Sequence, residues 1–245
     1  MDQATASLLL VFSLPCLVLS EHRSRSHIGT VAFKLLSSLA FLAGPCLAPS
    51  TEWTSYRIAI VIGLLFSLVG DWFLLPSRKD FHNPTQQDIP LSFQLGVVAF
   101  AAAHIAYIIA FMQLPQGISV PVLLTVFIAT MLLARWLGVI YPHRDSSATQ
   151  NVLNLSIPPD MKPLVLVYAA IISSMFATAV STGLAHDGVP YHTVGAAMFV
   201  VSDVFVAKNA FGQTPPQQRG WFRITVGYGL YFWGQMVIAG TASTL

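Results

Sequence analysis

The chain has 245 residues, of which 55% are hydrophobic and only 9% are charged. A soluble domain of this size could not cover its surface with so few charged side chains, and the formal net charge of +2 gives no reason to expect a nucleic-acid partner. Apolar runs of about 17–25 residues, the length that a bilayer demands, recur along the chain. The composition therefore predicts an all-α, polytopic integral membrane protein with no soluble domain.

Eight apolar spans follow one another in a single transmembrane domain covering residues 1–245. The first is unlike a cleavable signal peptide, because Asp2 precedes it while Arg23 and Arg25 follow it. We expect the first span to remain uncleaved, with its N-terminus outside. Cys16 and Cys46 both fall within spans, so no disulfide framework is expected. The predicted spans cover residues 4–20, 28–48, 57–75, 92–111, 119–138, 163–180, 193–211 and 223–241.

Basic residues separate the loops into two groups. Arg57 is the one basic residue of the even-numbered loops, and Lys34 lies inside the second span. By the positive-inside rule, the odd-numbered loops face the cytoplasm and both termini lie on the opposite side. The two longest connections, 76–91 and 139–162, would then form a partly ordered lid or rim on the cytoplasmic face. The odd-numbered loops and their span ends hold Arg23, Arg25, Arg78, Lys79, Arg135, Arg144, Lys162, Lys208, Arg219 and Arg223.

Two apolar stretches, 63–71 and 195–203, each end in an aspartate. In both, a glycine lies eight residues before the aspartate and a small residue, Gly70 or Ser202, directly before it. Ionisable residues inside membrane spans are costly and usually functional, so Asp71 and Asp203 are the first candidates for a site. The stretches are four spans apart and run parallel. This favours two parallel four-helix halves, related by an axis along the membrane normal.

The other polar residues of the spans converge on the same depth. Asp71 and Asp203 are expected in the cytoplasmic halves of their spans, and Lys34 about two turns from the same face. Lys34 could extend to the head groups or be the counter-ion of an aspartate or of a substrate phosphate. The aspartates could instead be structural, bonded to a neighbouring helix or to Lys34. The pattern favours a cavity open to the cytoplasm.

His104 lies near the middle of the fourth span, with Phe100 and Tyr107 on the same helix face. The remaining histidines fall in loops or at span ends, and no His-x-x-x-His or His-Glu pair occurs within a span. A zinc site of the intramembrane hydrolase kind needs three or four converging ligands and is poorly supported. We therefore interpret His104 as part of the pocket wall, hydrogen-bonded to Tyr107 or to an aspartate and binding no metal.

These residues resemble those of the YhhN-like lysoplasmalogenases. The chain departs from that family at Leu35, where a proline is expected, and in the length of its two long loops. The resemblance implies eight spans and hydrolysis of the vinyl-ether bond of lysoplasmalogens to a fatty aldehyde and glycerophosphocholine or glycerophosphoethanolamine. It also implies that Asp71 and Asp203 are catalytic. It rests on Gly70-Asp71, on Phe93, Gly96, Phe100, His104, Tyr107 and Phe111, on Ser202-Asp203, and more weakly on Lys34, Tyr168, Tyr231 and Gln235.

The chemistry of a vinyl ether fits a pair of carboxyl groups. The bond is protonated on carbon, which gives an oxocarbenium ion that water traps as a hemiacetal. Glycosidases stabilise the same kind of cation with two carboxyl groups. We expect the carboxyl groups of Asp71 and Asp203 to face one cavity, about 5–10 Å apart. If the second and third spans are neighbours, Asp71 lies near Lys34, which favours Asp71 as the carboxylate and Asp203 as the acid without assigning them.

No metal or organic cofactor is required by this chemistry, and the expected partners are a lysophospholipid substrate and membrane lipids. The residues expected around the two aspartates are Lys34, Ser67, Phe100, His104, Tyr107, Tyr168, Ser202, Tyr231 and Gln235.

Two other classes of function fit the same residues. A proton-coupled transporter could use the aspartates as a relay between parallel halves, and a lipid-sensing or scaffold protein could carry them as structural groups. Release of aldehyde by purified protein in detergent separates the enzyme from both. The endoplasmic reticulum is a candidate location. The sequence leaves open the preferred head group, the oligomeric state and which aspartate is the acid.

Overall fold

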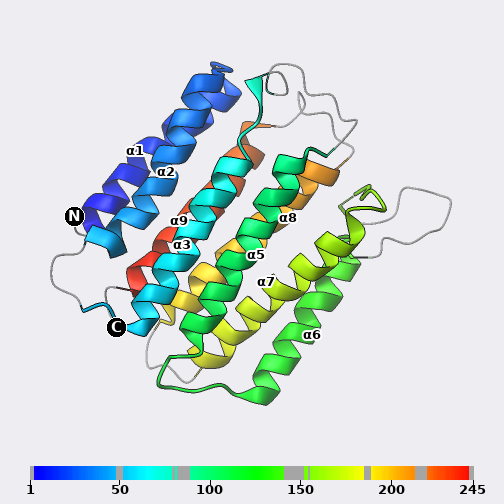
Figure 1. Cartoon of the computed structure of the whole chain (residues 1–245). Helices are drawn as coiled ribbons and strands as arrows, with labels where there is room; N and C mark the ends of the chain where they lie inside the picture. The colour runs from blue at the N-terminus through cyan, green and yellow to red at the C-terminus, as the bar shows by residue number, and fades with distance from the viewer. Residues whose placement is uncertain are drawn as a thin grey trace.

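The computed structural model describes residues 3–47, 52–78, 81, 89–140, 152–153, 155–184, 189–212 and 220–242. These residues form eight α-helices in an antiparallel bundle (Figure 1). Their one extended pairing is an isolated bridge between Leu155 and Gly212. The helices are α1 (Gln3–His22), α2 (His27–Leu47), α3 (Ser55–Phe73), α5 (Leu91–Phe111), α6 (Val120–Trp136), α7 (Lys162–Gly183), α8 (Tyr191–Phe211) and α9 (Trp221–Thr241).

The predicted fold class, an all-α polytopic membrane protein, is confirmed. Within the described residues, six helices are long and apolar enough to cross a membrane: α1, α2, α3, α5, α7 and α8. α6 is apolar but has 17 residues. α9 carries several polar residues along its 21 positions. Each of these two helices packs beside a helix that is long and apolar enough to cross a membrane, α6 on α7 and α9 on α8.

The two ends of the bundle differ in charge. The last residues of α1, α3, α6 and α8 and the first residues of α2, α5, α7 and α9 all lie at one end, toward the upper right of Figure 1. We call this the basic end, because the described basic residues of the odd-numbered loops lie there. Lys79, Arg144 and Arg219 fall outside the described residues, as does most of the two long connections. The described part of 139–162 packs at this end, where the Ser156 amide donates to the Phe211 carbonyl at 2.8 Å.

At the opposite end, one buried arginine joins α2 to α3. The side chain of Thr54 accepts from the backbone amide of Arg57 and begins α3. The Arg57 guanidinium donates through Nε and Nη2 to the Pro45 carbonyl in the last turn of α2, at 3.0 and 2.5 Å. A carbonyl in the last turn of a helix has no intrahelical partner, so Arg57 satisfies it and fixes the spacing of the two helices.

The helix packing repeats in two groups of four. Consecutive helices pack in the order α1, α2, α3, α5, and again in the order α6, α7, α8, α9. Between the groups, α5 packs on α7 and α9 packs on α2. In both contacts the fourth helix of one group packs on the second helix of the other, so the two contacts are equivalent. This arrangement supports two parallel halves. They are not identical, because α1 also packs on α9, whereas no contact of that extent joins α6 to α5 among the described residues.

The two matched glycines lie at equivalent helix contacts. A Cβ atom at Gly63 of α3 would overlap the ring of Tyr107 on α5. A Cβ atom at Gly195 of α8 would lie 2.6 Å from Ile238 Cγ1 and 2.9 Å from the Gly234 carbonyl oxygen of α9. Small residues therefore let each aspartate-bearing helix approach its partner closely.

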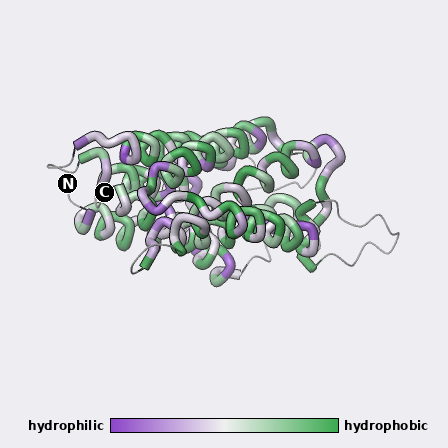
Figure 2. The backbone as a smooth tube through the Cα atoms, turned by 90° about the horizontal axis from the view of Figure 1, so that it is seen from below, coloured by the Kyte–Doolittle hydropathy of each residue, from purple (hydrophilic) through white to green (hydrophobic). Residues whose placement is uncertain are grey.

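The surface and interior of the bundle show the distribution expected of a protein in lipid. Large apolar side chains such as Phe12, Ile28 and Leu132 are exposed, and α6 has no buried residue. Figure 2 shows hydrophobic residues along the length of the helices. Several polar side chains, in contrast, are buried inside, among them Lys34 and Gln235. Because polar groups in lipid need internal partners, the interior is where a site should lie.

Candidate functional site

A cavity of about 440 Å³ lies in the half of the bundle nearer the basic end. Every one of the eight helices contributes at least one residue to its lining, and most of the lining is apolar. Both Asp71 and Asp203 line it, together with Lys34, Tyr168 and Tyr231. Five residues predicted from the sequence to surround one site are thus brought to one cavity, from α2, α3, α7, α8 and α9.

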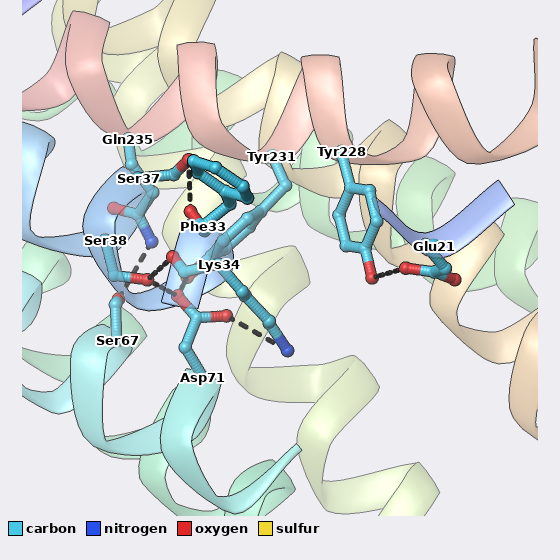
Figure 3. A network of polar contacts seen from close by, with 10 residues as sticks. All are labelled: Glu21, Phe33, Lys34, Ser37, Ser38, Ser67, Asp71, Tyr228, Tyr231 and Gln235. Atoms are coloured by element: carbon cyan, nitrogen blue, oxygen red, sulfur yellow. Dashed lines mark hydrogen bonds and ion pairs between the residues drawn. The ribbon is translucent and has the colours of Figure 1, made fainter. Parts of the chain in front are cut away.

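Asp71, in the last turn of α3, is surrounded by donors (Figure 3). Lys34 Nζ lies 3.6 Å from Asp71 Oδ1. Ser38 Oγ and Tyr231 Oη each donate to Asp71 Oδ2 at 2.7 Å. Lys34 and Asp71 are both buried. A buried ion pair is tolerated when further hydrogen bonds satisfy its remaining lone pairs, and the two hydroxyl donors fulfil that condition. The surroundings of Asp71 suit an ionised carboxylate.

Asp203, on α8, has a different environment. Its Oδ2 accepts a hydrogen bond from Tyr168 Oη at 2.5 Å. No cation of the described residues lies within ion-pair distance of it. The preceding Ser202 donates to the Phe199 carbonyl of its own helix at 2.7 Å, so its hydroxyl does not reach the aspartate beside it. Asp203 is therefore held by one neutral donor, while Asp71 is held by a cation and two hydroxyls.

His104 is buried behind Tyr168, and its predicted hydrogen bond to Tyr107 or to an aspartate is wrong. Its Nδ1 lies 2.5 Å from the Phe100 carbonyl, one turn earlier in α5. A carbonyl only accepts, so Nδ1 carries the proton and Nε2 is the bare acceptor. The Phe100 carbonyl is one helical turn before His104, whereas the Tyr107 hydroxyl donates to Gln235 and only the Tyr107 ring contacts the imidazole. Nε2 is buried without a hydrogen-bond partner in the described residues.

Ser67, Tyr107 and Gln235 form a second polar cluster. Tyr107 Oη donates to Gln235 Oε1 at 2.6 Å, and Gln235 Nε2 donates to Ser67 Oγ at 2.8 Å. These bonds join α5, α9 and α3. None of the three residues lines the cavity. Ser67 lies one turn from Asp71 and Gln235 one turn from Tyr231, so the cluster fixes the two helices that carry those residues.

The two remaining predicted site residues both lie at the cavity. Phe100 and Ser202 line the cavity, and Gly70 gives the Phe100 ring the space it occupies against α3. Sequence reasoning missed Ser38, although it lies four residues after Lys34 and hence on the same helix face. It also missed Glu21, which lines the cavity from the end of α1. Within the described residues, no three His, Cys, Asp or Glu side chains gather as a metal site.

Comparison with known proteins gives a family and several relatives. The model of the YhhN family matches residues 29–242. A Dictyostelium discoideum protein named "Lysoplasmalogenase homolog" is 26% identical over 212 residues, which cover 76% of this chain and 63% of the relative. Bos taurus "Lysoplasmalogenase TMEM86A" is 28% identical over 189 residues, 75% of this chain and 64% of the relative. Sus scrofa "Lysoplasmalogenase TMEM86B" is 33% identical over 130 residues, 53% and 47% of the two chains.

The chain spans less than two thirds of the length of these curated relatives. No solved structure matches it. The family model, in contrast, covers most of the chain and includes Lys34, both aspartates and all the residues bonded to them. The chain belongs to the YhhN family.

Proposed function

We propose that the protein hydrolyses the vinyl-ether bond of a lysoplasmalogen and releases a fatty aldehyde and a glycerophospho-alcohol. The observation that carries this proposal is that Asp71 and Asp203 line one cavity in unlike surroundings. Two of the relatives are named lysoplasmalogenases and the third a lysoplasmalogenase homolog, which supports the same reaction.

Asp203 is the proton donor in this proposal. Its carboxylic acid protonates the second carbon of the alkenyl chain, and the double-bond electrons form the new C–H bond. Tyr168 donates to one oxygen of Asp203, which leaves the other oxygen to carry the transferred proton. The first carbon of the chain becomes an oxocarbenium ion. Proton transfer from a positioned acid contributes about 100- to 10,000-fold to such a step.

Asp71 is the carboxylate that stabilises the cation. Water adds to the oxocarbenium carbon, its proton returns to a carboxylate, and the resulting hemiacetal breaks its bond to the glycerol oxygen. The net change consumes one water and leaves an aldehyde and a glycerol hydroxyl. Lys34, Ser38 and Tyr231 hold Asp71 in place, so its charge is positioned before the reaction begins.

The shape and lining of the cavity suit a lipid with one chain. Its volume of about 440 Å³ lies within the range of small-molecule sites. Apolar side chains such as Leu133 of α6, Ile172 of α7 and Val204 of α8 line it beside the aspartates. Ligand pockets combine an apolar wall with a few polar groups that fix orientation. Here the polar groups are those around the two carboxyls.

Purified protein in detergent tests the reaction directly. We expect it to release aldehyde from a 1-alkenyl lysophospholipid and no aldehyde from the saturated 1-alkyl analogue, whose ether cannot be protonated on carbon. The paired halves are also an arrangement found in transporters. A transporter would release no aldehyde in detergent and would act only across a sealed vesicle, which would refute the hydrolase.

We also propose that the basic end faces the cytoplasm, in accordance with the bias of basic residues toward that end. Single cysteines at Ser77 and at Gln113, which lie at opposite ends of the bundle, should then react with a membrane-impermeant reagent from opposite sides. Reaction of both from the same side would contradict the arrangement of spans, and reaction of Ser77→Cys from outside intact cells would reverse the orientation.

A further inference from the structure

An arginine lies at the basic end of the cavity with its donors unused. Arg223 is in the first turn of α9 and lines the cavity. Its Nε and Nη2 atoms are buried and have no hydrogen-bond partner among the described residues. A guanidinium carries five N–H donors and no acceptor. Burying such donors unmatched is costly, so this position suits an anion with several oxygen atoms.

A carboxylate lines the same cavity. Tyr228, between Arg223 and Tyr231 on α9, donates to Glu21 Oε2 of α1 at 2.6 Å (Figure 3). Glu21 lines the cavity as well. Its described partner is a neutral hydroxyl, and no ion pair joins it to Arg223 in the described part of the chain. The cavity lining thus holds a positive and a negative group that do not form an ion pair with each other in the described residues.

We propose that Arg223 and Glu21 form a subsite for the zwitterionic head group of the lipid, an inference that rests on the proposed function. Arg223 binds the phosphodiester, because a guanidinium matches two phosphate oxygens at once. Glu21 faces the ammonium group. The eight residues from Arg223 to Tyr231 rise about 12 Å along α9. The glycerol therefore lies between the head group at Arg223 and the alkenyl bond at the aspartates.

The subsite makes binding depend on the phosphate first and on the amine second. A 1-alkylglycerol presents neither charge, a 1-alkyl glycerophosphate presents the anion alone, and a 1-alkyl glycerophosphoethanolamine presents both. None of the three contains a vinyl ether, so none is hydrolysed. Their binding to the full-length protein in detergent micelles measures the subsite without turnover.

The wild-type protein should bind the ethanolamine lipid about ten- to a hundred-fold more tightly than the alkylglycerol, the range expected of hydrogen bonds to charged groups. Arg223→Gln should abolish that preference, and Arg223→Lys should keep part of it. Glu21→Gln should weaken binding of the ethanolamine lipid and leave binding of the glycerophosphate unchanged. Arg135→Gln is the matched control, because Arg135 is an exposed arginine at the same end and does not line the cavity.

Two results would overturn the subsite: a preference that survives in folded Arg223→Gln, or an equal loss of affinity for all three lipids. If Arg223→Gln does not fold, the test rests on Arg223→Lys. A wild-type preference for the ethanolamine lipid over the alkylglycerol in that variant would also overturn the subsite. The test of the subsite can fail independently of the test of the proposed function. Aldehyde release without a phosphate preference refutes the subsite alone, and the preference without aldehyde release refutes the hydrolase alone.

Discussion

The two halves of the molecule carry an aspartate at equivalent positions but surround it differently. Asp71 contacts Lys34 of α2, and Asp203 contacts Tyr168 of α7. α2 and α7 are equivalent helices in the two groups of four, and both residues lie about two turns from the basic end. A lysine on one side and a tyrosine on the other therefore give one carboxyl a cation and the other a neutral donor. A matched scaffold can in this way supply unlike carboxyls to one cavity.

Removal of either carboxyl should have the largest effect. Asp71→Asn and Asp203→Asn keep size and polarity but can neither balance a cation nor donate a carboxylic proton. Each should lower kcat by about 100- to 10,000-fold in an aldehyde-release assay. Binding of the non-hydrolysable 1-alkyl lipid should stay close to that of the wild type.

The control for this pair is Asp160→Asn, an exposed aspartate that does not line the cavity. Its activity should match the wild type. Near-normal aldehyde release by either cavity variant would refute the mechanism that uses two carboxyls.

Loss of Lys34 should lower the free energy of unfolding. Lys34→Met leaves the buried Asp71 charge without a cation, and breaking a buried ion pair costs about 3–5 kcal/mol. The double variant with Asp71→Asn should recover most of that free energy of unfolding, because no unpaired charge remains. Thermal or denaturant unfolding in detergent measures both. Equal destabilisation of the single and double variants would show that Lys34 matters for packing and not as a counter-ion.

Loss of the Tyr168 hydroxyl should destabilise the protein less than loss of Lys34. Tyr168→Phe removes one neutral hydrogen bond, worth about 0.5–1.5 kcal/mol, and leaves no unpaired charge. We expect a fall in kcat of about ten-fold or less, with KM almost unchanged, since Tyr168 acts through Asp203 and keeps its ring in the wall. A loss as large as that of Asp203→Asn would mean that the phenol itself takes part in proton transfer.

The sequence predicts the bundle well because membrane spans are local features. Length, apolar composition and the bias of basic residues give the helices in order, and the repeated Gly…Asp stretches point to the two aspartates. The Lys34–Asp71 pair follows from consecutive helices lying side by side. Arg223 was visible only as a loop charge, because its place in the cavity depends on how α9 meets α1 and α8.

Other contacts could not be read from the sequence. Serines are common in spans and usually bond to their own helix, so the place of Ser38 four residues after Lys34 does not by itself mark it as a partner of Asp71. The partner of His104 is a backbone carbonyl, which every residue carries and no pattern reveals. In both cases the sequence gives the side chain but not the group that lies within hydrogen-bond distance of it.

The proposed reaction requires one aspartate to be a carboxylic acid and the other a carboxylate in the resting protein. Infrared difference spectroscopy at neutral pH distinguishes the two forms, because a protonated carboxyl has a C=O stretching band that a carboxylate lacks. We expect one such band from the cavity of the wild type, lost in Asp203→Asn and kept in Asp71→Asn. A band that persists in Asp203→Asn and disappears in Asp71→Asn would contradict the assignment.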